Sequence, residues 1–238
     1  MFQHSPKQRA INLGSGALPA ATLASITIGQ NIPAGALLAV IIQGAQTAAT
    51  AVTTTVLGKG DEISLGPAGP FSFDAATAAY IRWVVFRTPS GYNSGQSILL
   101  SGSSAWPATT YATLVYLENS SQYLGYGGAA FAAGANVAFG FTVALGSGTI
   151  ISNAFRNSVV ELCFSTNAAA VAWNGLGNNL ATPDAGTWTS FINGAGTGLG
   201  VINLWAAYSQ RPPVSSSIIG RYAVAVNTYH VFIRFGGG

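Results

Sequence analysis

Charged side chains are scarce in this chain of 238 residues, where they make up 6% of the sequence, against about 25% in an ordinary soluble domain. The nine lysines and arginines are scattered, so we find no concentrated basic patch of the kind that binds nucleic acid. An isolated soluble protein normally carries more surface charge. We therefore expect much of the exterior to be covered in an assembly, the alternative being a glycine-rich, monomeric, secreted β domain.

Groups that could carry out acid–base or metal chemistry are also few. The chain has one cysteine, two histidines and six carboxylates. Cys163 has no internal disulfide partner and is expected to be a small core residue. His4 and His230 do not have the spacing of metal ligands. We predict no catalytic residue, no metal site and no cofactor.

The carboxylates do not suggest a catalytic pair. Asp61 and Glu62 are adjacent, and adjacent side chains of an extended chain point to opposite faces. Glu118 and Glu161 lie at the end or in the middle of predicted strands, as glycosidase carboxylates can. A solvated or ion-paired carboxylate explains them more simply. A glycan hydrolase that uses these carboxylates stays open as an alternative. We nevertheless predict that the chain is not an enzyme.

Long apolar helices are missing from the pattern. Residues 125–151 are uncharged and long enough to span a bilayer. Their apolar side chains alternate, however, with Val137 and Phe139 on one face, and period two marks a half-buried strand. We expect no membrane insertion. Gly14 and Pro19 interrupt the apolar stretch near the N-terminus, so we also expect no signal peptide.

The chain does contain many short apolar segments that are bounded by turn residues. Residues 80–87 read Tyr-Ile-Arg-Trp-Val-Val-Phe-Arg and predict a buried strand. Residues 201–208 resemble them, because Trp205 lies 205 minus 83, or 122, positions after Trp83. A similar segment at an offset of about half the chain length suggests an internal duplication.

Two further pairs of apolar segments support the duplication. Residues 36–42 and 158–164 are separated by the same offset of 122. Residues 112–117 and 230–235 are separated by 230 minus 112, or 118, positions, which indicates a loop about four residues shorter in one half. We expect each half to supply matching strands to one two-sheet core.

These patterns predict an all-β protein with a jelly-roll-like β-sandwich fold, built from two pseudo-equivalent halves. We predict an extended N-terminal arm over residues 1–24 and a single β-sandwich domain over residues 25–238. The halves cover about residues 25–120 and 137–238. Residues 118–134 are predicted to be a loop between them.

The predicted arm is expected to bind a partner or the chain's own sheet, since a stretch with little periodicity is otherwise loosely held. Its candidate partner-binding residues are Phe2, Lys7, Arg9, Ile11 and Leu13.

A second set of candidates consists of aromatic residues in predicted loops beside Asn, Ser and Gly. Such surfaces suit protein contacts or stacking on sugars. Alternatively, these rings fold back and cap the ends of the sandwich. The candidates are Trp106, Tyr123, Tyr126, Trp173 and Trp188.

Residues 25–40 read Ser-Ile-Thr-Ile-Gly-Gln-Asn-Ile-Pro-Ala-Gly-Ala-Leu-Leu-Ala-Val and precede the strands predicted at 80–87 and 111–117. A looser repeat follows at 204–208 and 229–235. This order of strand segments resembles that of the β-sandwich structural proteins of tailed phages and prophages.

The resemblance implies a non-enzymatic virion structural protein: a capsid decoration, a head spike or fibre, or a tail-tip protein. It would be made in the host cytoplasm and assemble on the capsid or an appendage through its arm and sheet edges. Its partners would be further copies of itself, as a homo-oligomer, and a capsid or tail protein. The alternative is a carbohydrate-binding, lectin-like module that uses the loop aromatics to bind a host surface glycan.

Overall fold

The computed structural model describes residues 9–45, 52–65, 72–74, 79–107, 110–131, 138–142, 159–167, 173–177, 188–194, 203–209, 217–222 and 228–237. Its strands are β1 (Arg9–Ala17), β2 (Leu23–Thr27), β3 (Ala36–Ala45), β4 (Thr54–Val56), β5 (Ile63–Ser64), β6 (Ser72–Asp74), β7 (Ala79–Thr88), β8 (Ser97–Gly102), β9 (Thr110–Glu118), β10 (Ser120–Phe131), β11 (Ala138–Thr142), β12 (Val159–Asn167), β13 (Trp173–Gly177), β14 (Trp188–Gly194), β15 (Asn203–Ser209), β16 (Ser217–Tyr222) and β17 (Thr228–Gly237). Strands are the sole regular elements of this described part, and their pairing is antiparallel. The predicted all-β class is confirmed. Across the same residues, no helix is long and apolar enough to cross a membrane.

The first half of the chain forms two sheets. The larger sheet has the order β1-β9-β3-β7-β5, with β6 also paired to β7. The smaller sheet has the order β2-β8-β4. Many strands that are neighbours in a sheet are therefore far apart in sequence, as in β1 with β9 and β2 with β8.

The second half repeats this arrangement. Its larger sheet has the order β10-β17-β12-β15-β14 and its smaller sheet has the order β11-β16-β13. When β6, which has no counterpart among the described strands of the second half, is left out of the count, the two larger sheets match position by position, and so do the two smaller ones. The three repeated segments fall on β3 and β12, on β7 and β15, and on β9 and β17. The strand order thus has two pseudo-equivalent halves, while the jelly-roll description stays a prediction.

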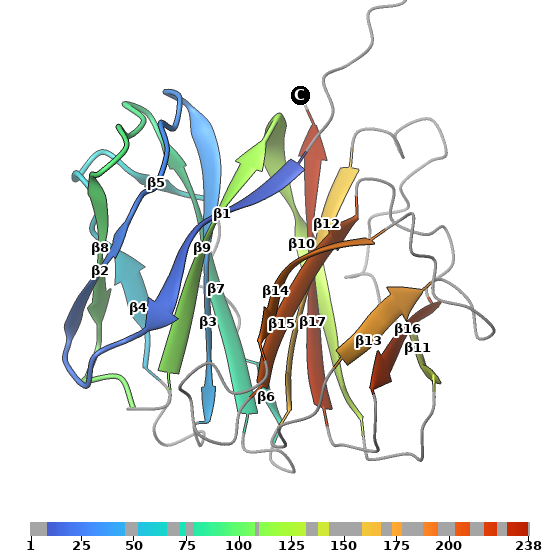
Figure 1. The fold of residues 1–238 in the computed structure, drawn as a ribbon. Helices are drawn as coiled ribbons and strands as arrows, with labels where there is room; N and C mark the ends of the chain where they lie inside the picture. The colour runs from blue at the N-terminus through green and yellow to red at the C-terminus, as the bar shows by residue number, and fades with distance from the viewer. Residues whose placement is uncertain are drawn as a thin grey trace, which may run out of the picture.

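Figure 1 shows these sheets as successive layers, with the smaller sheets outside and the larger sheets adjacent in the middle. This differs from the single two-sheet core that the sequence suggested. One cluster of buried residues lies between β2-β8-β4 and the larger sheet of the first half, and it contains Leu38, Ile98 and Trp106. A second cluster lies on the other face of that larger sheet and joins Ile41 to Phe235 of β17.

Strand β3 shows why the larger sheet occupies the middle. Residues 37–42 read Leu-Leu-Ala-Val-Ile-Ile, and each of them is 0% exposed. Successive side chains of a strand point to opposite faces. A strand that is apolar at every position must therefore be covered on both sides. Each large side chain buried in this way contributes about 1.5–3 kcal/mol of transfer free energy.

Residues 9–17, which we assigned to the N-terminal arm, form β1 and pair with β9 of the chain's own sheet, which is one of the two binding modes expected for the arm. Residues 120–131, within the predicted loop 118–134, form β10 and pair with β17. The loop prediction was wrong because Gly125, Gly127 and Gly128 weaken the intrinsic strand signal. Pairing along β17, with two register shifts, overrides that signal.

Candidate interaction surface

Strands β1 and β2 lie at the edges of the two sheets of the first half, on the same side of the sandwich. They approach each other closely at Gly14. A Cβ atom on Gly14 would lie 2.9 Å from Ile26 Cγ2 and 3.0 Å from the Thr27 carbonyl oxygen. Glycine is therefore required at this position for the two strands to meet.

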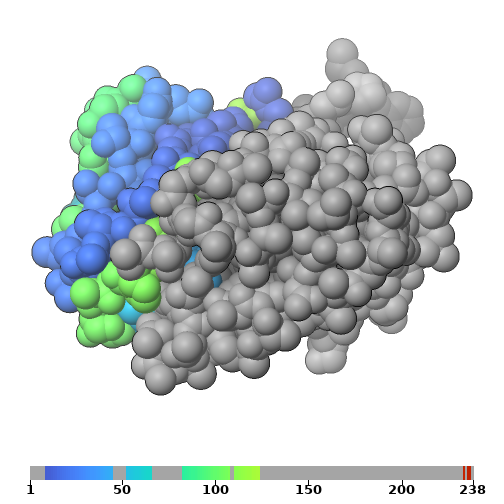
Figure 2. All heavy atoms as spheres, turned by 60° about the horizontal axis from the view of Figure 1, so that its bottom comes forward, coloured from blue at the N-terminus to red at the C-terminus, as the bar shows by residue number. Residues whose placement is uncertain are grey.

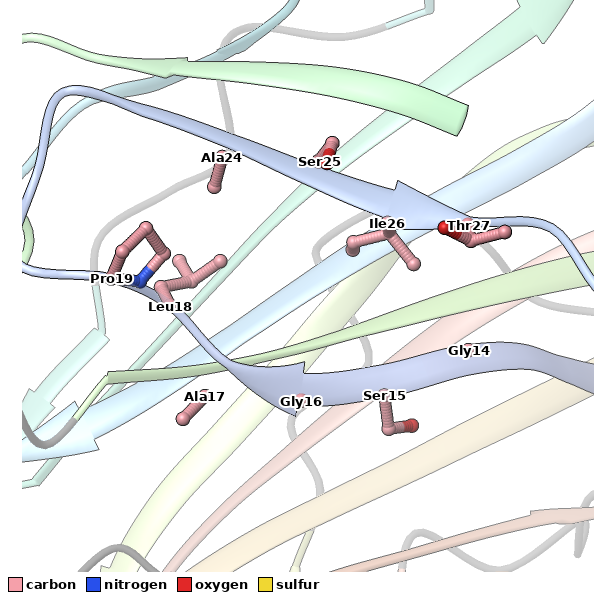
Figure 3. A pocket seen from close by; sticks show the side chains of 10 residues that line it. All are labelled: Gly14, Ser15, Gly16, Ala17, Leu18, Pro19, Ala24, Ser25, Ile26 and Thr27. Atoms are coloured by element: carbon pink, nitrogen blue, oxygen red, sulfur yellow. The ribbon is translucent and has the colours of Figure 1, made fainter. Parts of the chain in front are cut away.

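Beyond Gly14 the two strands separate and leave a groove, which Figure 3 shows from close by. Its volume is about 260 Å³. A Cβ atom on Gly16 would meet nothing within 4 Å. None of the residues that line it has an ionisable side chain, so this groove lacks the groups that acid–base catalysis requires. The lining residues are Gly14, Ser15, Gly16, Ala17, Leu18, Pro19, Ala24, Ser25, Ile26 and Thr27.

The outer face of the β2-β8-β4 sheet continues from this groove. The three strands contain no charged residue. In β2 the burial alternates, with Ala24 and Ile26 buried and the odd-numbered residues exposed. Leu23 is 53% exposed and Leu99 of β8 is 37% exposed. The blue atoms of the N-terminal strands and the green atoms of residues 82–107 lie side by side at one side of the molecule in Figure 2.

The predicted arm residues do not form one exposed set. Phe2 and Lys7 lie outside the described residues. The Arg9 side chain is 56% exposed, and its Nε donates to Glu118 Oε2 of β9 at 2.6 Å. Ile11 packs against the core between the two sheets, and Leu13 is buried in it at 6% exposure. Ile11 and Leu13 therefore contact the chain's own core, because β1 pairs with β9.

Of the five candidate aromatic residues, Trp106 is buried and Tyr123 is partly buried against the core. Trp106 is 1% exposed, and its Nε1 donates to Thr54 Oγ1 at 3.2 Å. It presents no face to a ligand. Tyr123 lies in β10, where its ring centroid is 5.9 Å from that of Phe235. Its hydroxyl accepts a hydrogen bond from Trp83 Nε1 at 3.4 Å, so Tyr123 contributes to the contact between the two halves.

The other three aromatic candidates lie in strands and not in loops. Tyr126 is within β10, Trp173 is the first residue of β13, and Trp188 is the first residue of β14. Their side chains lie outside the part of the chain whose side chains are described. The sequence placed them in loops because Asn and Gly surround them. Strand pairing with β17, β16 and β15 explains their observed positions.

The acidic pair Asp61 and Glu62 serves a structural role. Glu62 accepts hydrogen bonds from the backbone N–H groups of Lys59 and Gly60, and the Tyr92 hydroxyl donates to its Oε1. Asp61 Oδ2 accepts from Ser90 N at 3.1 Å. These bonds join the loop after β4 to the loop after β7, so the two carboxylates face the same neighbouring loop and not opposite faces of the chain.

Tyr92 is the most strongly perturbed group in this loop contact. Burial raises the pKa of its phenol well above the ordinary value, and the hydrogen bond to Glu62 and the charge of Glu62 add to the shift. The Lys59 ammonium lies 4.5 Å from the Tyr92 ring centroid and donates to the Gly91 carbonyl at 2.6 Å. A phenol held neutral in this way stabilises the loops. The described residues also contain no group of three or more His, Cys, Asp or Glu that could hold a metal ion.

Comparison with known proteins adds little to this description. No family model matches the chain, and no curated protein matches it. Among solved structures, the crystal structure of PBSX exported protein XepA is 9% identical, with 95% of this chain and 86% of that chain covered, and the TM-score is 0.22. A TM-score this low does not establish a common fold.

Proposed function

We propose that this chain is a non-enzymatic structural protein of a tailed phage or phage-like particle, which assembles on the capsid or on an appendage. The observation that carries the proposal is the outer face of the β2-β8-β4 sheet, which has exposed leucines and no charged residue on its strands. Soluble monomers usually keep their surfaces charged. A face of this kind is stabilised when another protein covers it.

The chemistry of the described side chains supports a non-enzymatic role. Asp61 and Glu62 are engaged with backbone N–H groups, and Glu118 is paired with Arg9. The groove between β1 and β2 has no ionisable lining. An active site for acid–base chemistry needs titratable groups that converge on a pocket. We therefore expect no turnover on polysaccharides, and measurable hydrolysis that is lost on Glu161→Gln would contradict this part of the proposal.

The test of particle assembly is co-purification. Particles from an infected or induced culture are separated on a density gradient, and each fraction is analysed for this chain by mass spectrometry. We expect the chain in the particle fraction at a constant ratio to the major capsid protein. Immunogold labelling then distinguishes head from tail. A chain that stays at the top of the gradient in every preparation would contradict a virion role.

The structure also sharpens the test of the N-terminal arm. Deleting residues 1–24 would remove β1 and with it Leu13 and Leu18, which are buried in the core. Such a protein could fail to assemble because it fails to fold. Deleting residues 1–8 leaves β1 intact. If the arm anchors the protein, this shorter deletion lowers incorporation into particles while thermal stability is unchanged.

A further inference from the structure

Edge strands of sheets in natural proteins are usually protected against pairing with other chains by bulges, charge, proline or short length. Most described edge strands here follow that rule. Register shifts interrupt β1, β10, β13 and β14. Strands β4, β5 and β6 are two or three residues long.

Strands β2 and β11 do not follow it. Each has five residues without charge or proline, Leu-Ala-Ser-Ile-Thr in β2 and Ala-Phe-Gly-Phe-Thr in β11. Each pairs with its neighbour without a register shift. They occupy the same position in the two halves, as the first strand in the order of each smaller sheet. Within the described part of the chain, the same protection is therefore missing from two strands at equivalent places.

The hydrogen bonds of β2 show which backbone groups are directed away from the sheet. Ile28 N donates to Gln96 O, and Gly102 N donates to Thr22 O, each at 2.8 Å. In an antiparallel pair, bonding alternates from residue to residue. The even-numbered residues of β2 thus bond to β8, while the N–H and C=O groups of Leu23 and Ser25 point to the open edge.

The groove supplies space beside that edge. The Thr27 carbonyl is directed at Gly14 of β1, so β1 closes the edge at this end. Toward Leu23 and Ser25 the strands separate, and the facing position on β1 is Gly16, which has open space around it. A larger side chain at position 16 would occupy the room that an added strand requires.

From these observations we propose that the β2 edge pairs with β11 of a second copy of this chain, and that the incoming strand lies in the groove beside Gly16. Both strands are uncharged, and neither has a bulge or a proline among its described residues. The contact is head-to-tail, because β2 and β11 belong to different halves. Repeated contacts of this type produce a ring or a filament. The inference deepens the proposed function by naming the partner at this edge.

The first experiment measures molar mass as a function of concentration, by light scattering and by sedimentation, for the full chain and two variants. Ser25→Pro removes an outward N–H group and leaves the bonds to β8, which an edge strand tolerates. Gly16→Val fills the groove. We expect the mass of the wild-type protein to increase with concentration. Each variant should weaken association about tenfold or more, Ser25→Pro because an intermolecular hydrogen bond is lost and Gly16→Val because the incoming strand is displaced from its hydrogen-bonding position.

Gly29→Val is the matched control. A Cβ atom on Gly29 would have only the Leu13 carbonyl oxygen nearby, at 3.8 Å, and Gly29 is not part of the groove lining. It should associate like the wild-type protein, and thermal unfolding should show that all variants are folded. Association equally weakened by Gly29→Val, or a wild-type protein that stays monomeric at its solubility limit, would overturn the proposal.

The second experiment identifies the strand that binds. A benzophenone amino acid at position 25 is activated by light in assembled protein, and the cross-linked peptides are sequenced by mass spectrometry. Cross-links to residues 138–142 of another copy support the proposal, and cross-links to any other segment overturn it. If assembly by this edge fails while the chain still purifies with particles, the proposed function stands and the inference about β2 does not.

Discussion

The larger sheet of the first half and the smaller sheet beside it differ in how their strands are covered. In β3, residues 37–42 are each 0% exposed. In β2, buried and exposed residues alternate, and Leu23 is 53% exposed. Both strands are built largely from apolar and small residues. The difference teaches that a layer covered on both faces requires apolar residues throughout, whereas an outer layer needs them on one face only.

The largest expected effect tests the buried contact between the halves. Trp83 is 1% exposed and belongs to the cluster that includes Ile233 and Phe235. Trp83→Ala leaves a cavity there and should lower the free energy of unfolding by about 3–5 kcal/mol, measured by urea denaturation. Leu99→Ala on the outer face is the control and should change it by less than about 0.5 kcal/mol. Similar effects of the two variants would contradict the layer assignment.

A smaller effect is expected where β1 meets β2. Gly14→Val places side-chain atoms where Ile26 and Thr27 already lie, and overpacking of this kind costs about 1–3 kcal/mol. Gly16→Val, two residues away, enters open space and should be within about 0.5 kcal/mol of the wild type. Thermal unfolding of the two variants compares them directly. If Gly14→Val is as stable as Gly16→Val, the edges are not in contact.

The loop contact at Tyr92 predicts a loss of stability in alkali. Its pKa is raised in the folded protein, so the folded state holds this proton more tightly than the unfolded state. The stabilisation is complete below the unfolded pKa of about 10 and is lost as the pH rises above that value. Urea denaturation at pH values on both sides of about 10 measures how steeply the free energy of unfolding decreases with pH.

Tyr92→Phe is the control for this pH dependence. In this variant the free energy of unfolding should decrease less steeply with pH. Some decrease should remain, because burial also raises the pKa of Tyr111 and Tyr116. An identical slope in the wild type and Tyr92→Phe would show that Tyr92 is not responsible.

The smallest effect is expected at the exposed rim of the larger sheet. Arg9 and Glu118 form an ion pair in which the Arg9 side chain is 56% exposed. Arg9→Ala should cost no more than about 1 kcal/mol, and the cost should decrease further at high salt. A double-mutant cycle with Glu118→Ala measures the coupling between the two side chains. A coupling that is large and insensitive to salt would indicate that this rim is covered.

Much of the strand content could be predicted from the sequence. The segments that became β3, β7 and β9 are dense in β-branched and aromatic residues, and their echoes became β12, β15 and β17. Strand β10 was missed because its glycines and alanines carry little propensity. Trp106 was predicted to lie in a loop, either binding a ligand or folded back onto the sandwich, and it is buried because Thr54 and the core between the two sheets surround it.

The groove could not be predicted. Its two walls come from different sheets, β1 paired with β9 and β2 paired with β8. The small residues at positions 14–17 were visible in the sequence. The effect of a small residue depends on which residues face it. A Cβ atom at position 14 would meet Ile26 and Thr27, whereas one at position 16 would enter open space.

By itself, the sequence determined that this protein is all-β and that its second half repeats the strand segments of the first. Alternation and propensity act locally, so they identify strands and the faces that must be apolar. The tertiary structure decided which sheets cover those faces and which edges remain open. These depend on pairing between strands that are tens of residues apart, and no local pattern specifies the partner.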